Sequence, residues 1–267
     1  MHHHQRGDVP EEGSHVLDIQ RLGPASLVLV RHGESIGNLA DAKARQAGQS
    51  RLDLHERDAD VPLSDTGREQ AQALGRHVAD LPATARPTAV VSSPYRRSAD
   101  TARLALDTAG STVPVLHDER LRERELGVFD GLTGTGIRAE YASEAQRREH
   151  LGKFYYRPPG GESWCDVALR VRSFLRDVGA EPTTDRLWVF THQAVISCFR
   201  YVLEGMDEAA VLELDRTVAV PNASTTTYRR GPSGVPELVH YASSGAVEAA
   251  GAPSTHEPEH AGRGSTS

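Results

Sequence analysis

Short apolar runs alternate along the chain with longer segments whose apolar residues recur at helical spacing. The apolar runs predict strands at residues 26–31, 88–92, 113–117 and 186–191, with two later candidates at 225–229 and 237–241. The amphipathic segments predict helices at residues 65–80, 95–109, 134–150, 163–178 and 194–203. This alternation is typical of an α/β fold, and we expect a three-layer α/β/α sandwich with a mostly parallel central sheet.

Both ends of the chain have a different composition from the segment between them. Residues 1–24 are polar and begin with a short histidine tract, so we expect a flexible leader. Residues 243–267 are rich in Ala, Gly, Ser, Pro and Glu, which predicts a disordered tail. Residues 25–242 contain no internal repeat and are predicted to form a single domain.

Composition narrows the class of protein. With 38% hydrophobic and 25% charged residues, the chain lies in the range of soluble globular proteins. No apolar run approaches the roughly 20 residues of a membrane helix, and the first residues lack a secretory signal. A net charge of −7 argues against a nucleic-acid partner. Two cysteines, Cys165 and Cys198, are interpreted as buried thiols, which favours a cytoplasmic location. The oligomeric state stays open.

Polar side chains follow several of the predicted strands at their carboxyl ends. In a parallel sheet these ends lie at one edge, and ligands bind there. Arg31 and His32 end the first strand, Arg96 and Arg97 follow the second, and His192 follows the fourth. Glu123 lies between the third strand and the next helix. Arginine forks match phosphate oxygens, a neutral imidazole is a nucleophile near neutral pH, and a carboxylic acid can protonate a leaving oxygen. A second, protonated histidine would neutralise the phosphoryl oxygens. The set predicts phosphoryl transfer.

Five ordered motifs carry a resemblance to a known family. They are "RHG" (31–33), "SSPYRRSADTA" (92–102), "LRERELGVFDG" (121–131), "PPGGES" (158–163) and "THQAVIS" (191–197). In this order they resemble the histidine phosphatase superfamily, which includes cofactor-dependent phosphoglycerate mutases and fructose-2,6-bisphosphatases. The resemblance implies that His32 is the phosphorylated nucleophile and Glu123 the proton donor. It also implies a phosphate pocket made by Arg31, Arg97 and His192.

The resemblance extends to residues around the phosphate. Gly33 is expected to leave room for the phosphate, and Asn38 to contact the phosphoryl group. Further substrate contacts are expected from Arg124, Gln193, Tyr156 and Arg157, the last two from a local likeness to fructose-2,6-bisphosphatase domains. No metal and no cofactor are implied, because arginines and histidines supply the positive charge. The expected partner is a small phosphorylated metabolite.

Three functions remain open at this point. We favour a phosphatase that hydrolyses a small phosphomonoester through a phosphohistidine on His32. The runner-up is a phosphoglycerate mutase type of phosphoryl transfer, although Gly37 stands where the mutases carry tryptophan. The third is a catalytically inactive protein that binds a phosphorylated ligand. Glu125, two residues after Glu123, is the alternative proton donor.

Overall fold

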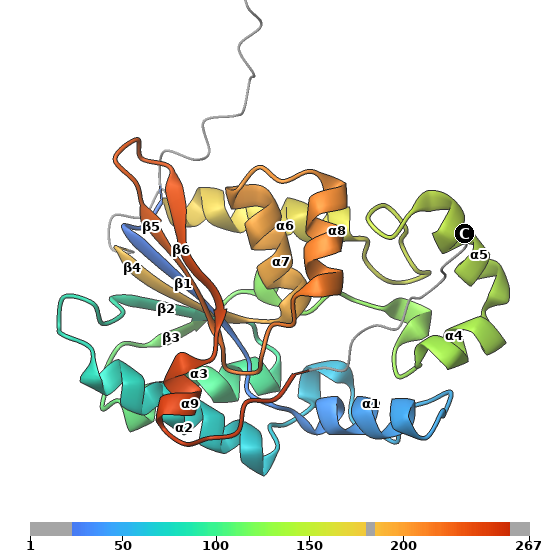
Figure 1. Cartoon of the computed structure of the whole chain (residues 1–267), viewed down its shortest axis with the longest axis horizontal. Coiled ribbons are helices and arrows are strands. Elements are labelled where there is room, and N and C mark those ends of the chain that lie inside the picture. Colours follow the sequence, from blue (N-terminus) through green and yellow to red (C-terminus); the bar gives the residue numbers. More distant parts are fainter. Residues whose placement is uncertain (1–22, 180–184, 257–267) are drawn as a thin grey trace, which may run out of the picture.

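The fold is built on a six-stranded sheet with the order β3-β2-β4-β1-β5-β6 (Figure 1). The computed structural model describes residues 23–179 and 185–256. The strands are β1 (Ser26–Arg31), β2 (Ala89–Ser92), β3 (Val115–His117), β4 (Arg186–Thr191), β5 (Thr225–Arg230) and β6 (Pro236–Ser243). The first four pair in parallel, and β5 and β6 add antiparallel strands at one edge. The predicted α/β sandwich is confirmed.

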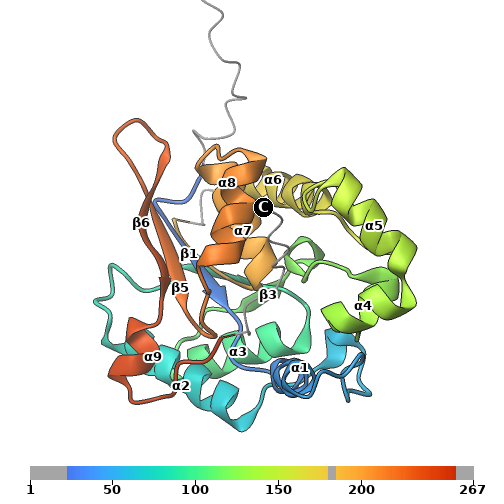
Figure 2. The same cartoon turned by 45° about the vertical axis from the view of Figure 1, so that its right-hand side comes forward.

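Helices cover both faces of the sheet (Figure 1). One face carries α6 (Trp164–Gly179), α7 (Gln193–Leu203) and α8 (Glu208–Thr217). The other carries α2 (Asp65–Asp80), α3 (Arg96–Thr108) and the short α9 (Gly245–Ala249). Three more helices, α1 (Ile36–Gln46), α4 (Gly134–Glu140) and α5 (Ala142–Leu151), lie beyond the end toward which β1 runs (Figure 2). Short 3₁₀ turns occur at Asp58–Asp60, Glu119–Leu121 and Gly127–Phe129.

Strand β1 is buried on both faces, which explains its uninterrupted apolar run. Leu27 and Leu29 pack in the core shared with α6 and α7. Val28 and Val30 pack in the second core, against α2 and α3. Because side chains alternate along a strand, the four residues of β1 before Arg31 contribute in turn to the two cores, and the strand end is fixed in position.

The structure differs from the expected disordered tail. Residues 243–256 are folded: α9 packs against α2, and residues 250–256 continue toward the carboxyl edge of the sheet. This segment folds without large apolar side chains because Val247 is fully buried and backbone hydrogen bonds hold its other residues. The last part of the predicted tail (257–267) and most of the predicted leader (1–22) lie outside the described residues. Among the residues described, no helix is both long and apolar enough to traverse a bilayer.

Candidate active site

His32 lies directly after β1 with 2% of its surface exposed. Its Nδ1 is 2.7 Å from the carbonyl oxygen of Gly33. A carbonyl oxygen only accepts hydrogen bonds, so Nδ1 carries the proton and Nε2 keeps a lone pair. Burial lowers the pKa of His32 well below its usual value, and the positive charges of Arg97 and Arg31 lower it further. The imidazole is therefore neutral, which the predicted role of His32 as nucleophile requires.

The loop after His32 is fixed by α2 and α3. The backbone N–H of Gly33 donates to Thr101 Oγ1 at 3.0 Å, and that of Glu34 donates to Gln70 Oε1 at 2.9 Å. A Cβ on Gly33 would lie 2.5 Å from the carbonyl oxygen of Gly67 in α2. The glycine is therefore required by packing against this helix, a reason different from the expected close approach of a phosphate to the backbone.

Two arginines lie close enough to His32 to act on its charge. Arg31 is completely buried, and its Nη1 donates to the carbonyl oxygen of Val220. Arg97, in the first turn of α3, is 6% exposed and is held by Asp58. Its Nη1 lies 2.9 Å from Asp58 Oδ1 and donates to the Asp58 carbonyl oxygen at 2.6 Å. Two guanidinium groups thus provide the charge that a phosphate dianion needs.

His192 follows β4 and is fully buried beside His32, with ring centroids 5.2 Å apart. Its Nε2 lies 2.9 Å from the hydroxyl oxygen of Ser93. Burial lowers the pKa of His192 well below its usual value, and Arg97 lowers it further. The protonated form expected from the sequence is therefore disfavoured in the free protein, where His192 is a neutral hydrogen-bonding group.

Two glutamates compete for the role of proton donor, and they lie in different surroundings. Glu123 Oε2 is 3.9 Å from His192 Nδ1, and Glu123 Oε1 accepts a hydrogen bond from the backbone N–H of Arg124 at 2.9 Å. Glu125 is more exposed, and its Oε1 accepts from the Tyr95 hydroxyl at 2.6 Å. Only Glu123 of the two contacts the histidine pair, which favours the residue chosen from the sequence.

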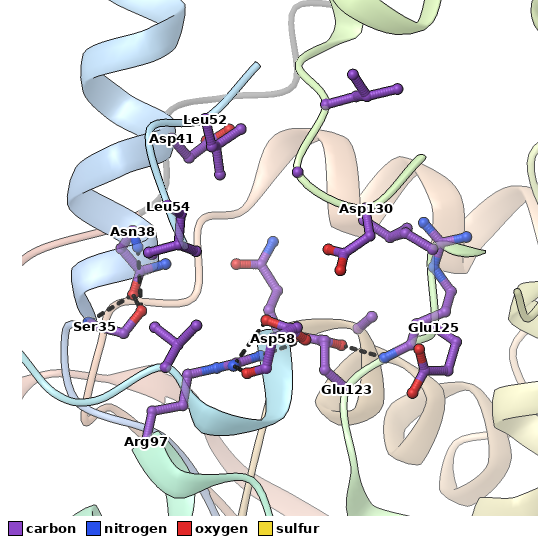
Figure 3. A pocket seen from close by; sticks show the side chains of 18 of the residues that line it. Ser35, Asn38, Asp41, Leu52, Leu54, Asp58, Arg97, Glu123, Glu125 and Asp130 are labelled. Atoms are coloured by element: carbon purple, nitrogen blue, oxygen red, sulfur yellow. Dashed lines mark hydrogen bonds and ion pairs between the residues drawn. The ribbon is translucent and has the colours of Figure 1, made fainter. Parts of the chain in front are cut away.

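His32 lines a cavity of about 610 Å³, part of whose wall is drawn in Figure 3. His32, Arg97, Glu123, Arg124, Asn38 and Gln193 all line it. Asn38 Oδ1 accepts from the backbone N–H of Ser35 at 3.0 Å and so caps α1. Its amide nitrogen is the group it can offer to a phosphoryl oxygen. Six of the eleven predicted site residues therefore line one cavity, whereas Arg31, Gly33 and His192 are not among its lining residues.

Tyr156 and Arg157, two further predicted substrate contacts, also lie outside the lining of this cavity. Tyr156 is 3% exposed and packs with Phe129 and Leu132, and its hydroxyl donates to Glu144 at 2.9 Å. Arg157 is exposed and forms an ion pair with Asp166 near the start of α6, its Nε donating at 2.8 Å. Both side chains stabilise the loop ahead of α6, since an aromatic cluster holds one and a helix-capping carboxylate the other.

The structure adds residues that the motifs do not include. Asp58 reaches Arg97 from a loop that has no motif of its own. Asn222 donates from Nδ2 to the carbonyl oxygen of His32 at 3.2 Å, and its backbone N–H donates to Thr255 at 2.7 Å. The Thr255 hydroxyl in turn accepts from Gln70 at 2.8 Å. Nothing in the sequence around Asn222 or Thr255 distinguishes them from ordinary loop residues.

Comparison with known proteins agrees with the resemblance carried by the sequence motifs. A sequence model of the histidine phosphatase superfamily (branch 1) matches residues 27–243. The chain is 33% identical over 202 residues to 2,3-bisphosphoglycerate-dependent phosphoglycerate mutase 2 of Gloeobacter violaceus, covering 74% of this chain and 84% of that protein. It is 36% identical over 157 residues to glucosyl-3-phosphoglycerate phosphatase of Mycolicibacterium vanbaalenii, a match that spans 59% of this chain and 61% of the phosphatase.

Solved structures show the same likeness. The native structure of a mycobacterial glucosyl-3-phosphoglycerate phosphatase has a TM-score of 0.63 at 27% identity, covering 82% of this chain and 99% of that one. The α-ribazole phosphatase from Shigella flexneri has a TM-score of 0.67 at 22% identity, covering 82% of this chain and 96% of its own, and shares the fold.

Proposed function

The chain belongs to the histidine phosphatase superfamily, and from that premise we propose that it hydrolyses a small phosphomonoester through a phosphohistidine on His32. The observation that carries the proposal is the hydrogen bond from His32 Nδ1 to the Gly33 carbonyl, which leaves Nε2 as the nucleophilic atom. Relatives named as phosphatase and as mutase both fit a phosphoryl-transfer enzyme.

In the first step, Nε2 of His32 attacks phosphorus and the bond to the ester oxygen breaks. Arg31 and Arg97 stabilise the charge on the phosphoryl oxygens, and His192 hydrogen-bonds to them through the nitrogen that Ser93 now occupies. Glu123 donates its proton to the departing alkoxide, so that the alcohol leaves neutral. Its position beside His192 supports this role.

In the second step, water attacks the phosphohistidine. The Glu123 carboxylate accepts a proton from that water, the P–N bond breaks, and Nε2 recovers its lone pair. Inorganic phosphate leaves, and Glu123 is again protonated for the next cycle. The protein supplies position and charge at each stage, which is what phosphoryl transfer demands.

Mutase activity is the second candidate, and the Gloeobacter mutase supports it through its coverage. A mutase returns the phosphoryl group to a second hydroxyl and must hold an acid-bearing substrate while it does so. The cations that line this cavity are already bound by side-chain or backbone oxygens, as Lys153 is by Asp215 at 2.6 Å. This pairing favours hydrolysis.

A cytoplasmic location and a small phosphorylated metabolite as substrate complete the proposal. Cys165 and Cys198 are both free thiols, which agrees with a reducing compartment. The cavity accommodates a small molecule.

The deciding experiment separates phosphate release from isomerisation. Purified enzyme is incubated with p-nitrophenyl phosphate, fructose 2,6-bisphosphate, and 3-phosphoglycerate with and without 2,3-bisphosphoglycerate. We expect phosphate release, and a phosphorylated His32 trapped by acid-free mass spectrometry. Isomerisation without phosphate release would favour the mutase, and neither product would favour the inactive binding protein. His32→Ala should abolish turnover and trapping, whereas His117→Ala, on the exposed β3, should not.

A further inference from the structure

The wall of the catalytic cavity carries an excess of acids, and from it we infer the substrate class. We propose that the alcohol part of the substrate bears a positively charged amino group and no acid group, which rests on the proposed phosphatase function. The lining carboxylates are Asp41, Asp53, Glu56, Asp58, Glu123, Glu125, Asp130 and Asp215. The lining lysine and arginines are Arg45, Arg51, Arg97, Arg124 and Lys153.

These cations are already engaged. Arg45 pairs with Asp41 at 2.6 Å, Lys153 with Asp215 at 2.6 Å, and Arg97 with Asp58 at 2.9 Å. Arg51 pairs with Glu140, and Arg124 Nη1 donates to the Glu162 carbonyl oxygen at 3.3 Å. An acid group on the substrate would have to displace a carboxylate or a carbonyl oxygen from one of them, at a cost in free energy.

Carboxylates from three separate segments face the same space. Asp58, Glu123 and Asp130 surround it in Figure 3, with Glu125 beside them. Loss of hydration raises the pKa of Asp130, and the negative charges of Asp58 and Glu125 raise it further. The acids therefore repel one another. Neutral hydroxyls could hydrogen-bond to them, but only a cation would also relieve this repulsion.

Phosphate binding increases the excess of negative charge in the cavity. A phosphate on Arg97 would compete with Asp58 for the same guanidinium, so the bound dianion would leave the Asp58 carboxylate without its cation. The cavity, at about 610 Å³, is several times larger than a phosphate and has room for an alcohol part against these acids. Its lining also includes Leu52, Leu54 and Trp164, which fit a carbon skeleton. The two ends of the cavity thus select opposite charges.

The test compares three phosphates of hexose size: glucosamine 6-phosphate, glucose 6-phosphate and 6-phosphogluconate. They carry an ammonium, a hydroxyl and a carboxylate respectively, and the assay is run below the pKa of the amino group. We expect kcat/KM to fall in that order, by about tenfold from the ammonium to the hydroxyl compound. Asp130→Asn should reduce this preference to about threefold. Asp60→Asn removes the same charge from a surface pair with Arg57 and should keep the full preference.

Equal kcat/KM for the three compounds, a preference for the carboxylate, or an unchanged preference in Asp130→Asn would overturn the inference. In each of those cases, release of phosphate that depends on His32 would leave the proposed function standing. If no phosphate is released from these sugars or from p-nitrophenyl phosphate, both proposals fail together.

Discussion

The carboxylate of Asp58 holds the guanidinium of Arg97, with Oδ1 2.9 Å from Nη1 and Oδ2 3.1 Å from Nη2. Arg97 is almost completely buried, whereas the Asp58 side chain is 40% exposed on a loop. The free protein therefore presents Arg97, the proposed phosphate ligand, already paired with an acid. On that proposal a substrate gains the arginine only by separating this pair, and we expect the loop carboxylate to lower the affinity for phosphate.

Removing this acid should tighten phosphate binding. In Asp58→Asn, the inhibition constant of inorganic phosphate and the KM for p-nitrophenyl phosphate should fall roughly three- to tenfold, because the pair is partly screened by solvent. The Asp58 carbonyl still accepts from Arg97, so the loop keeps one anchor. Asp60→Asn, two residues along the same loop, should leave both constants unchanged. Unchanged phosphate inhibition in Asp58→Asn would show that the pair does not oppose binding.

The two glutamates can be separated by the leaving group. Glu123→Gln should lower kcat/KM for alkyl phosphates by about 10²–10³-fold, since an alkoxide needs a proton to leave. With p-nitrophenyl phosphate, whose phenolate leaves unaided, the loss should be much smaller. Glu125→Gln is the matched control and should show no such dependence on the leaving group. The reverse pattern would assign the proton donor to Glu125.

The buried histidines should make stability depend on pH. His32 and His192 have pKa values well below 6.5 in the native protein, chiefly because of burial, and His240 shifts in the same direction. Below pH 6.5 the unfolded chain binds protons that the native protein does not. As the pH is lowered below 6.5, the free energy of unfolding should therefore decrease, by up to about 1.4 kcal/mol per pH unit for each fully buried histidine. Above that pH both forms are neutral and the effect is absent.

Urea unfolding at about pH 7.5 and about pH 5.5 measures this effect. The exposed His117 provides the control, because His117→Gln should leave the difference between the two conditions intact. Equal stability at both conditions would contradict the burial of two neutral histidines.

The contact between α2 and the catalytic loop should tolerate no added atom. A Cβ on Gly67 would lie 1.9 Å from the carbonyl oxygen of Glu34. Gly67→Ala should destabilise the protein by about 1–3 kcal/mol and reduce turnover, because the loop that positions His32 must move. In Gly134→Ala the nearest atom is the flexible end of Arg138 at 3.5 Å, and stability should be unchanged or slightly higher. Thermal unfolding of both variants distinguishes these outcomes.

Periodicity and motifs predict the parts of the molecule that depend on local sequence. The strands and the helix at Asp65–Asp80 follow apolar patterns, and α2 has the predicted bounds. By contrast, α1 buries only Ala44, so its sequence carries little amphipathic signal. α9 was not predicted either, because its five residues are too short to show a period.

The same distinction holds for the site. His32, Arg97, Glu123 and His192 lie at element ends that the topology brings to one edge, and motif order predicts each of them as a site residue. The pairing of Asp58 with Arg97 joins residues 39 positions apart through a loop whose path is set by tertiary packing. Tyr156 and Arg157 show the opposite case, because their segment resembles a binding loop while its side chains turn to Glu144 and Asp166.

The sheet order places β1 between β4 and β5, which come more than 150 residues later in the chain. During synthesis, β1, which ends directly before His32, leaves the ribosome before either neighbour exists. It must remain unpaired, with its apolar face uncovered, until most of the domain has been translated. Closing contacts across so long a stretch of chain is slow. The nucleophile is therefore one of the first functional residues to be made and one of the last to reach its final surroundings, and this delay exposes the chain to aggregation.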